Sequence, residues 1–155
     1  MSVPTNSPCA IAWPPLVVLG TFGPGLLLHW LMPVPLPPPM PSIVLGALFC
    51  VTGGAVGAWG IAALRHAGTN VRPDHPTTVL VTDGPFRFSR NPLYLALTAL
   101  CLGITLMLDA LWPLLTLFPM VAILHWGIIP REEHYLEAKF GDAYRSYKAR
   151  VRRWI

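Results

Sequence analysis

The chain has very few charged residues, and long stretches have none. Only 12% of its 155 residues are charged, and no Asp, Glu, Lys or Arg precedes Arg65. Between Asn91 and Pro130 the only charged side chain is Asp109. A soluble domain typically carries roughly 25% charged residues. The shortage therefore excludes an ordinary soluble domain and indicates several membrane-spanning segments.

Patterns typical of disulfide frameworks and metal sites are also missing from the sequence. The three cysteines, Cys9, Cys50 and Cys101, lie far apart in or beside apolar segments. Such spacing fits neither a disulfide framework nor a metal site, so we interpret them as small buried residues. The five histidines form no H-x-x-x-H or H-E-x-x-H pattern. We therefore expect no bound metal.

Two kinds of signal that identify other protein classes are missing as well. The N-terminus has no basic region, so we expect no cleaved signal peptide. The sequence has no P-loop, no G-x-G-x-x-G after a strand and no G-x-S-x-G motif. Any nucleotide cofactor is therefore not expected to bind in the manner of a Rossmann domain.

The chain does contain four apolar segments, which polar or proline-rich connectors separate. We predict a single all-α integral membrane domain over residues 1–155, with about four transmembrane helices, a cytosolic loop and an amphipathic helical tail. The predicted spans are residues 10–32, 42–64, 92–108 and 110–129. The predicted connectors are a proline-rich segment at 33–41, the loop at 65–91 and the tail at 131–155, which bends at Gly141. The second span has glycines whose spacing lets another helix approach closely, namely Gly53, Gly57 and Gly60.

The polar loop has its own local signals. "TTVLV", residues 77–81, is a short extended candidate that would lie along the membrane surface. Asp83–Pro85 predicts a turn. Asn91 is suited to cap the third span, and Pro92 fits its first helical turn.

The distribution of charge predicts the orientation of the chain in the membrane. All eleven Lys and Arg residues lie between Arg65 and Arg90 or between Arg131 and Arg153. Four spans place both windows on one side, together with both termini, and the positive-inside rule makes that side cytoplasmic. We therefore expect an inner or cell membrane protein. Its basic residues would face membrane lipids and not nucleic acid.

Arginines gather where the loop meets the third span. Arg87 and Arg90 stand beside Asn91 and Tyr94 at a helix N-terminus, which offers free amides and a partial positive charge. This arrangement is typical of an anion site. The alternative is topology anchoring combined with a helix cap.

A pair of carboxylates, Glu132 and Glu133, follows the fourth span directly. Ionisable groups at a membrane boundary are functional candidates, and such a pair is suited to bind a cation or sugar hydroxyls. The alternative is compensation of a helix dipole. Composition and spacing leave both readings open.

Two sequence blocks resemble the isoprenylcysteine carboxyl methyltransferase and phospholipid methyltransferase superfamily, in its bacterial form. The first is "GPFRFSRNPLYLAL", residues 84–97, and the second is "REEHYLEAKFGDAYRSYKARVRRWI", residues 131–155. They are similar to a G-x-[YF]-x-x-x-R-[HN]-P-x-Y block and an E-E-x-x-L-x-x-x-F-G-x-x-Y-x-x-Y block that ends in V-x-R. An apolar hairpin of suitable length lies between them. The resemblance covers roughly Gly68 to the C-terminus.

The resemblance implies an integral membrane enzyme that uses S-adenosyl-L-methionine. It assigns the cofactor site to these matching residues: Thr78, Val79, Leu80, Val81, Phe86, Asn91, Pro92, Leu93, Tyr94 and Glu132. Asn91 stands where many members have histidine. Ile128 stands where the prenyl-protein enzymes have an arginine, although Arg131 is nearby.

We therefore predict a methyltransferase that acts on a lipophilic small molecule, a lipid or an isoprenoid-type acceptor at the cytosolic interface. Arg90, Tyr94 and Glu132 are its expected catalytic residues. Glu132 would hold the ribose or the ammonium group, Arg90 the methionine carboxylate, and Tyr94 would pack against the sulfonium or adenine. The oligomeric state stays open. The alternatives are an NADPH-dependent sterol-reductase-like oxidoreductase and a non-catalytic small membrane subunit.

Overall fold

The computed structural model describes residues 14–37, 43–70 and 77–155, and within these ranges the regular structure is helical, with no strand. The all-α prediction is confirmed for them. The helices are α1 Pro14–Leu31, α2 Ile43–His66, α3 Pro92–Met107, α4 Leu111–Ala122, α5 Ile129–Phe140 and α6 Asp142–Arg150. A short 3₁₀ turn, η1 Gly84–Arg87, precedes α3, and a π-helical segment, η2 Ile123–Ile128, joins α4 to α5.

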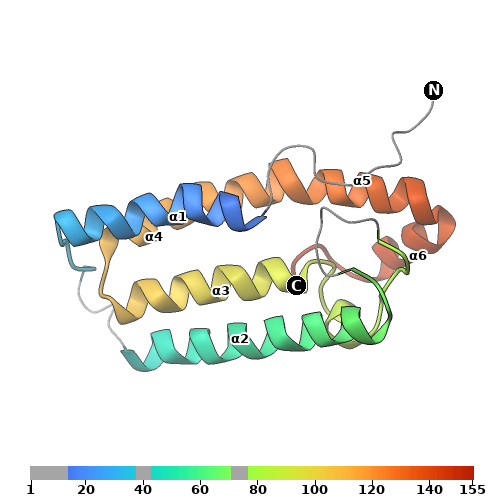
Figure 1. Ribbon diagram of the computed structural model, residues 1–155, viewed down its shortest axis with the longest axis horizontal. Helices are drawn as coiled ribbons and strands as arrows, with labels where there is room; N and C mark the ends of the chain where they lie inside the picture. Colours follow the sequence, from blue (N-terminus) through green and yellow to red (C-terminus); the bar gives the residue numbers. More distant parts are fainter. Residues whose placement is uncertain (1–13, 38–42, 71–76) are drawn as a thin grey trace.

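The helices run side by side in two packed pairs (Figure 1). α1 packs along α4, and α2 packs along α3. The polar loop, the start of α3, α5 and the C-terminus gather at one end of the bundle (Figure 1). Both sequence blocks of the predicted site therefore meet at the same end.

Glycines set the close approach of α2 to α3. Gly46, Gly53 and Gly60 are buried and recur every seven residues, so they share one face of α2. A Cβ atom on Gly53 would lie 2.8 Å from the carbonyl oxygen of Ala96, which leaves no room for any side chain. The predicted small-residue contact is confirmed for Gly53 and Gly60. A Cβ atom on Gly57 would lie 3.4 Å from the Cβ atom of Ala96, so Gly57 also faces α3, and it borders a cavity described below.

Two helices are long and apolar enough to cross a membrane, α2 and the continuous helix Leu111–Phe140. The segments Pro15–Leu31 and Pro92–Met107 are apolar but shorter, so a crossing by each of the four predicted spans is not established. The helix that carries the last predicted span, residues 110–129, continues without interruption to Phe140. Pro130, which would interrupt a regular helix, follows the wide turns of η2 and stands in the first turn of α5, where the missing N–H is tolerated.

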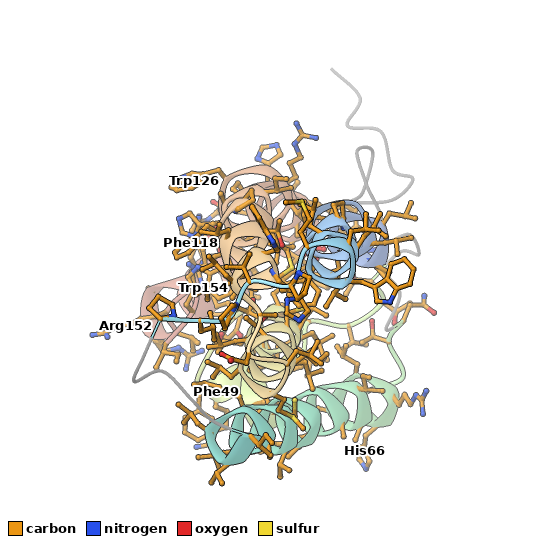
Figure 2. All side chains as sticks on the ribbon, turned by 90° about the vertical axis from the view of Figure 1, so that its left-hand side faces the viewer. Phe49, His66, Phe118, Trp126, Arg152 and Trp154 are labelled. Atoms are coloured by element: carbon orange, nitrogen blue, oxygen red, sulfur yellow. The ribbon has the colours of Figure 1, made fainter. Side chains whose placement is uncertain are left out.

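Large apolar side chains cover the outer surface of the bundle. Phe118 and Trp126 point away from the helix that carries them (Figure 2), with 68% and 74% of their surfaces exposed. Exposed apolar surface of this extent is typical of a lipid-facing protein. Two apolar helices of spanning length and this surface together indicate a membrane protein.

Candidate functional site

A cavity of about 740 Å³ opens among α1, α2, α3 and α5, beside the polar loop. Its volume lies within the range of sites for small molecules and cofactors. The predicted site residues that line it are Val79, Leu80, Val81, Phe86, Arg90, Asn91, Pro92, Leu93, Tyr94 and Glu132. Residues from both sequence blocks therefore share one hollow.

A hydrogen bond joins the two blocks across this cavity. The hydroxyl of Tyr94, in the first turn of α3, donates to Oε1 of Glu132, in the first turn of α5, at 2.6 Å. Tyr94 is 8% exposed, and Glu132 is half-buried. The distance is short for a hydrogen bond between two oxygen atoms. The pair thus places a fixed polar group in the lining of a mainly apolar hollow.

Glu133 has a different environment from its neighbour. It is 5% exposed and accepts two hydrogen bonds from Arg153, from Nε at 3.1 Å and from Nη2 at 2.8 Å. Arg90 Nη1 lies 3.2 Å from Glu133 Oε1. A buried carboxylate is tolerated only when it is paired. Glu133 is therefore a structural ion-pair centre, which leaves Glu132 as the carboxylate held by a neutral hydroxyl.

Arg90 retains hydrogen-bonding capacity at the edge of the cavity. Its side chain is only 9% exposed, and its Nε and Nη1 atoms have no hydrogen-bond partner among the described residues. The contact of Nη1 with Glu133 is an ion pair that lacks hydrogen-bond alignment. Buried donors without acceptors are rare and call for a partner. Arg90 is therefore suited to bind an anionic group in the cavity.

The other arginine of the first block takes no part in the cavity. Arg87 is exposed on η1 and does not line the hollow, and Arg131 is likewise exposed. Topology anchoring therefore remains the simplest reading for Arg87, whereas Arg90 points to the site. In the described part of the chain, no three His, Cys, Asp or Glu side chains come together as a metal site would require.

The polar loop forms one wall of the cavity. Val79, Leu80 and Val81 line it without regular secondary structure, so the extended candidate at 77–81 forms no strand. Thr78 does not line the cavity. Its N–H donates to Thr69 Oγ1 at 3.0 Å and its hydroxyl donates to the carbonyl of Gly68 at 3.1 Å, so Thr78 holds the loop in shape.

The start of α3 differs from the prediction in one respect. Asn91 stands at the N-cap position and Pro92 in the first turn, as predicted, but the Asn91 side chain makes no capping hydrogen bond. Its Nδ2 instead donates to the carbonyl of Arg153 at 3.0 Å. The prediction of a side-chain cap is therefore wrong, and the amide is instead bonded to the C-terminal segment through its nitrogen.

Several lining residues were not predicted from the sequence. Val18 and Leu19 of α1 line the cavity with apolar side chains, and Tyr144 and Tyr147 of α6 line it with aromatic ones. Nothing in the α1 sequence distinguishes its lining residues from lipid-facing ones. Burial, with a smaller contribution from Glu133, raises the pKa of Tyr144 to about 12, and Arg90 opposes the rise.

The sequence comparisons agree with this geometry. The phospholipid methyltransferase family matches residues 41–143, more than half of the chain and most of the cavity lining. An uncharacterized protein of Haemophilus influenzae is 43% identical over 63 residues, which are 41% of this chain and 100% of that protein. No solved structure is significantly similar to the chain. The chain thus belongs to the phospholipid methyltransferase family, a family of membrane methyltransferases within the isoprenylcysteine carboxyl methyltransferase-like superfamily.

Proposed function

We propose that this protein transfers a methyl group from S-adenosyl-L-methionine to a lipophilic acceptor at the cytosolic face of the membrane. The observation that carries the proposal is that one cavity has both a polar and an apolar lining. Tyr94, Glu132 and Arg90 lie where α3 and α5 begin and form its polar end, and apolar side chains of α1 and α3 also line it. The family match supports methyl transfer in general.

The residues at the polar end fit the charges of the cofactor. S-adenosyl-L-methionine carries an ammonium, a carboxylate, ribose hydroxyls and a sulfonium. Arg90, with its unused donors, suits the carboxylate, and Glu132 suits the ammonium or the ribose hydroxyls. The ring of Tyr94 suits a sulfonium or an adenine. When bound, the cofactor supplies an electrophilic methyl group.

The protein's contribution to such a reaction is positioning and exclusion of water. Methyl transfer is an in-line displacement, so it requires no covalent nucleophile from the protein. Tyr94 and Glu132, joined at 2.6 Å, are held by two different helices and offer a fixed polar contact. Leu80, Val81 and Phe86 line the same cavity with apolar surface, and apolar surface that excludes water strengthens electrostatic interactions.

The apolar part of the cavity indicates the nature of the acceptor. Val18 and Leu19 of α1 and Leu97 and Leu100 of α3 line the same hollow. Such walls favour a hydrocarbon chain or ring system and offer no partner for a polar body. The acceptor is therefore a lipid or a lipophilic small molecule, which would present its reactive atom to the polar end.

Ligand binding tests the proposal directly. The purified protein in detergent is titrated calorimetrically with S-adenosylhomocysteine and, separately, with NADPH. We expect saturable binding of S-adenosylhomocysteine, lost in Glu132→Ala, and no binding of NADPH. Glu137→Gln is the matched control, because Glu137 lies on the same helix but pairs with Lys148 and Arg145 outside the cavity. Binding of NADPH instead, or of neither ligand, would contradict the proposal.

Identification of the acceptor follows from the same preparation. A labelled methyl donor is incubated with the protein and a membrane lipid extract, and the labelled product is identified by mass spectrometry.

The predicted orientation has a separate test, since green fluorescent protein and alkaline phosphatase report opposite sides of a bacterial membrane. We expect the fluorescent fusion after Ile155 to be active and the phosphatase fusion to be inactive.

A further inference from the structure

The segment Arg152–Trp154, which follows α6, folds back onto the start of α3. The carbonyl of Arg152 accepts a hydrogen bond from the Arg90 N–H at 3.0 Å. The carbonyl of Arg153 accepts one from Ser89 Oγ at 3.2 Å and another from Asn91 Nδ2 at 3.0 Å. Two of these donors belong to residues that line the cavity. The segment is therefore bonded directly to residues that line the polar end of the cavity.

The same segment is attached to the helix that carries Glu132. Trp154 Nε1 donates to His125 Nδ1 at 2.8 Å, and the two rings stack with centroids 6.1 Å apart. His125 lies in η2, directly before α5. In Figure 2 Trp154 lies close against the helices, whereas Arg152 reaches the outer edge of the molecule. The short segment thus bridges α3 and η2.

A charged contact strengthens this bridge next to the site. Arg153 pairs with Glu133, which also pairs with Arg90. Neighbouring residues on an α-helix point about 100° apart. Fixing the side chain of Glu133 therefore also fixes the rotation of α5, and with it the direction in which Glu132 leaves the helix.

We propose that Arg152–Trp154 is a positioning strap, which sets the placement of Glu132 relative to Tyr94 and so determines cofactor affinity. The inference rests on the proposed function, because it concerns affinity at that site. Arg153 is its central residue. Its guanidinium pairs with Glu133 of α5, and its carbonyl accepts a hydrogen bond from Asn91 at the start of α3. Arg153 does not line the cavity and acts through these neighbours.

The test compares Arg153→Ala with Arg150→Ala. Arg150 is exposed, and its Nε bonds only the Ser146 carbonyl of its own helix. Dissociation constants for S-adenosylhomocysteine and melting temperatures without ligand are measured for both. We expect Arg153→Ala to weaken binding about tenfold, as coupling energies of contacting groups suggest. We expect Arg153→Lys to recover part of the lost affinity, because a lysine keeps the positive charge but cannot form a bidentate pair with the Glu133 carboxylate. Arg150→Ala should bind like the wild type.

Two further measurements separate the strap from general stability and from the proposed function. Trp154→Phe keeps an apolar ring but removes the indole donor, so it should weaken binding while lowering the melting temperature little. Hydrogen exchange at the Arg90 amide, which needs no ligand, should accelerate when residues 152–155 are deleted. Wild-type protein that fails to bind S-adenosylhomocysteine overturns the proposed function. Binding by Arg153→Ala within about twofold of a binding wild type overturns the strap.

Discussion

The hydroxyl of Tyr94 donates a 2.6 Å hydrogen bond to Oε1 of Glu132, which joins the first turn of α3 to the first turn of α5. The two residues are 38 positions apart in the sequence. Their contact is the point at which the two blocks of the family pattern become one site. Its removal should therefore affect ligand binding more than folding.

Substitution of Tyr94 by Phe isolates the hydroxyl from the ring. A hydrogen bond to a charged group is worth about 1.5–3 kcal/mol, so Tyr94→Phe should weaken binding of S-adenosylhomocysteine about tenfold or more. Calorimetric titration measures the change. Glu137→Gln is the control, because Glu137 lies outside the cavity and pairs with Arg145 and Lys148. Equal affinity in Tyr94→Phe and the wild type would show that the hydroxyl has no role in binding.

Replacement of Glu133 should lower the free energy of unfolding more than replacement of a surface carboxylate. Glu133→Gln leaves Arg90 and Arg153 without their common counter-charge, and breaking a buried ion pair costs about 3–5 kcal/mol. Asp142→Asn should cost less than about 1 kcal/mol, because Asp142 is 94% exposed although it pairs with Arg145. Unfolding in detergent compares the two variants. Similar losses in both would contradict the structural role of Glu133.

Two adjacent glycines of α2 give a sharp contrast. A Cβ atom on Gly53 would collide with the backbone of α3, and overpacking of this kind costs about 1–3 kcal/mol. A Cβ atom on Gly54 would meet nothing within 4 Å. We therefore expect Gly53→Ala to lower the melting temperature. Gly54→Ala should leave it unchanged or raise it, because alanine favours the helix by up to about 1 kcal/mol. The reverse order would mean that α2 does not pack on α3 through Gly53.

Tyr144 should make the protein sensitive to alkali. Its pKa is about 12 in the folded protein and about 10 in an unfolded chain. Between about pH 10 and 12 the unfolded state loses this proton first, so the free energy of unfolding falls as the pH rises. Tyr144→Phe should reduce that fall. Burial also raises the pKa of Tyr147, so Tyr147→Phe should act in the same direction. Melting temperatures from pH 9 to 11 measure both effects, and identical slopes in all three proteins would refute the assignment.

The sequence predicted the elements whose signals are local. The apolar runs, Pro92 in the first turn of α3 and the break at Gly141 are confirmed. Gly141 has a φ of 55°, which is unfavourable for residues with a side chain, so its position at the end of α5 follows from its chemistry. The continuation of the last helix through Pro130 was not predicted, because it depends on the π-helical geometry before it.

Contacts between distant segments were harder to predict. The sequence did not assign separate roles to Glu132 and Glu133, because their order along the chain cannot show which one faces the arginines. The Asn91 amide looked like a helix cap, because nothing local indicates that the Arg153 carbonyl lies within reach. The family pattern identified the two segments that line the cavity. Only the folded chain shows which of their side chains face the cavity and which ones hold it in place.

The π-helical segment η2 has a consequence for how this family can vary. A π-helical turn closes its hydrogen bonds over one more residue than an α-helical turn, so it accommodates an insertion in a helix. Removing one residue within Ile123–Ile128 should therefore allow the helix to return to regular turns with both flanks in place. The same removal between Ile129 and Glu132 would rotate Glu132 by about 100° relative to α4. Natural relatives that differ in length within this helix should carry the difference in η2 and keep the distance from α5's first residue to Glu132 constant.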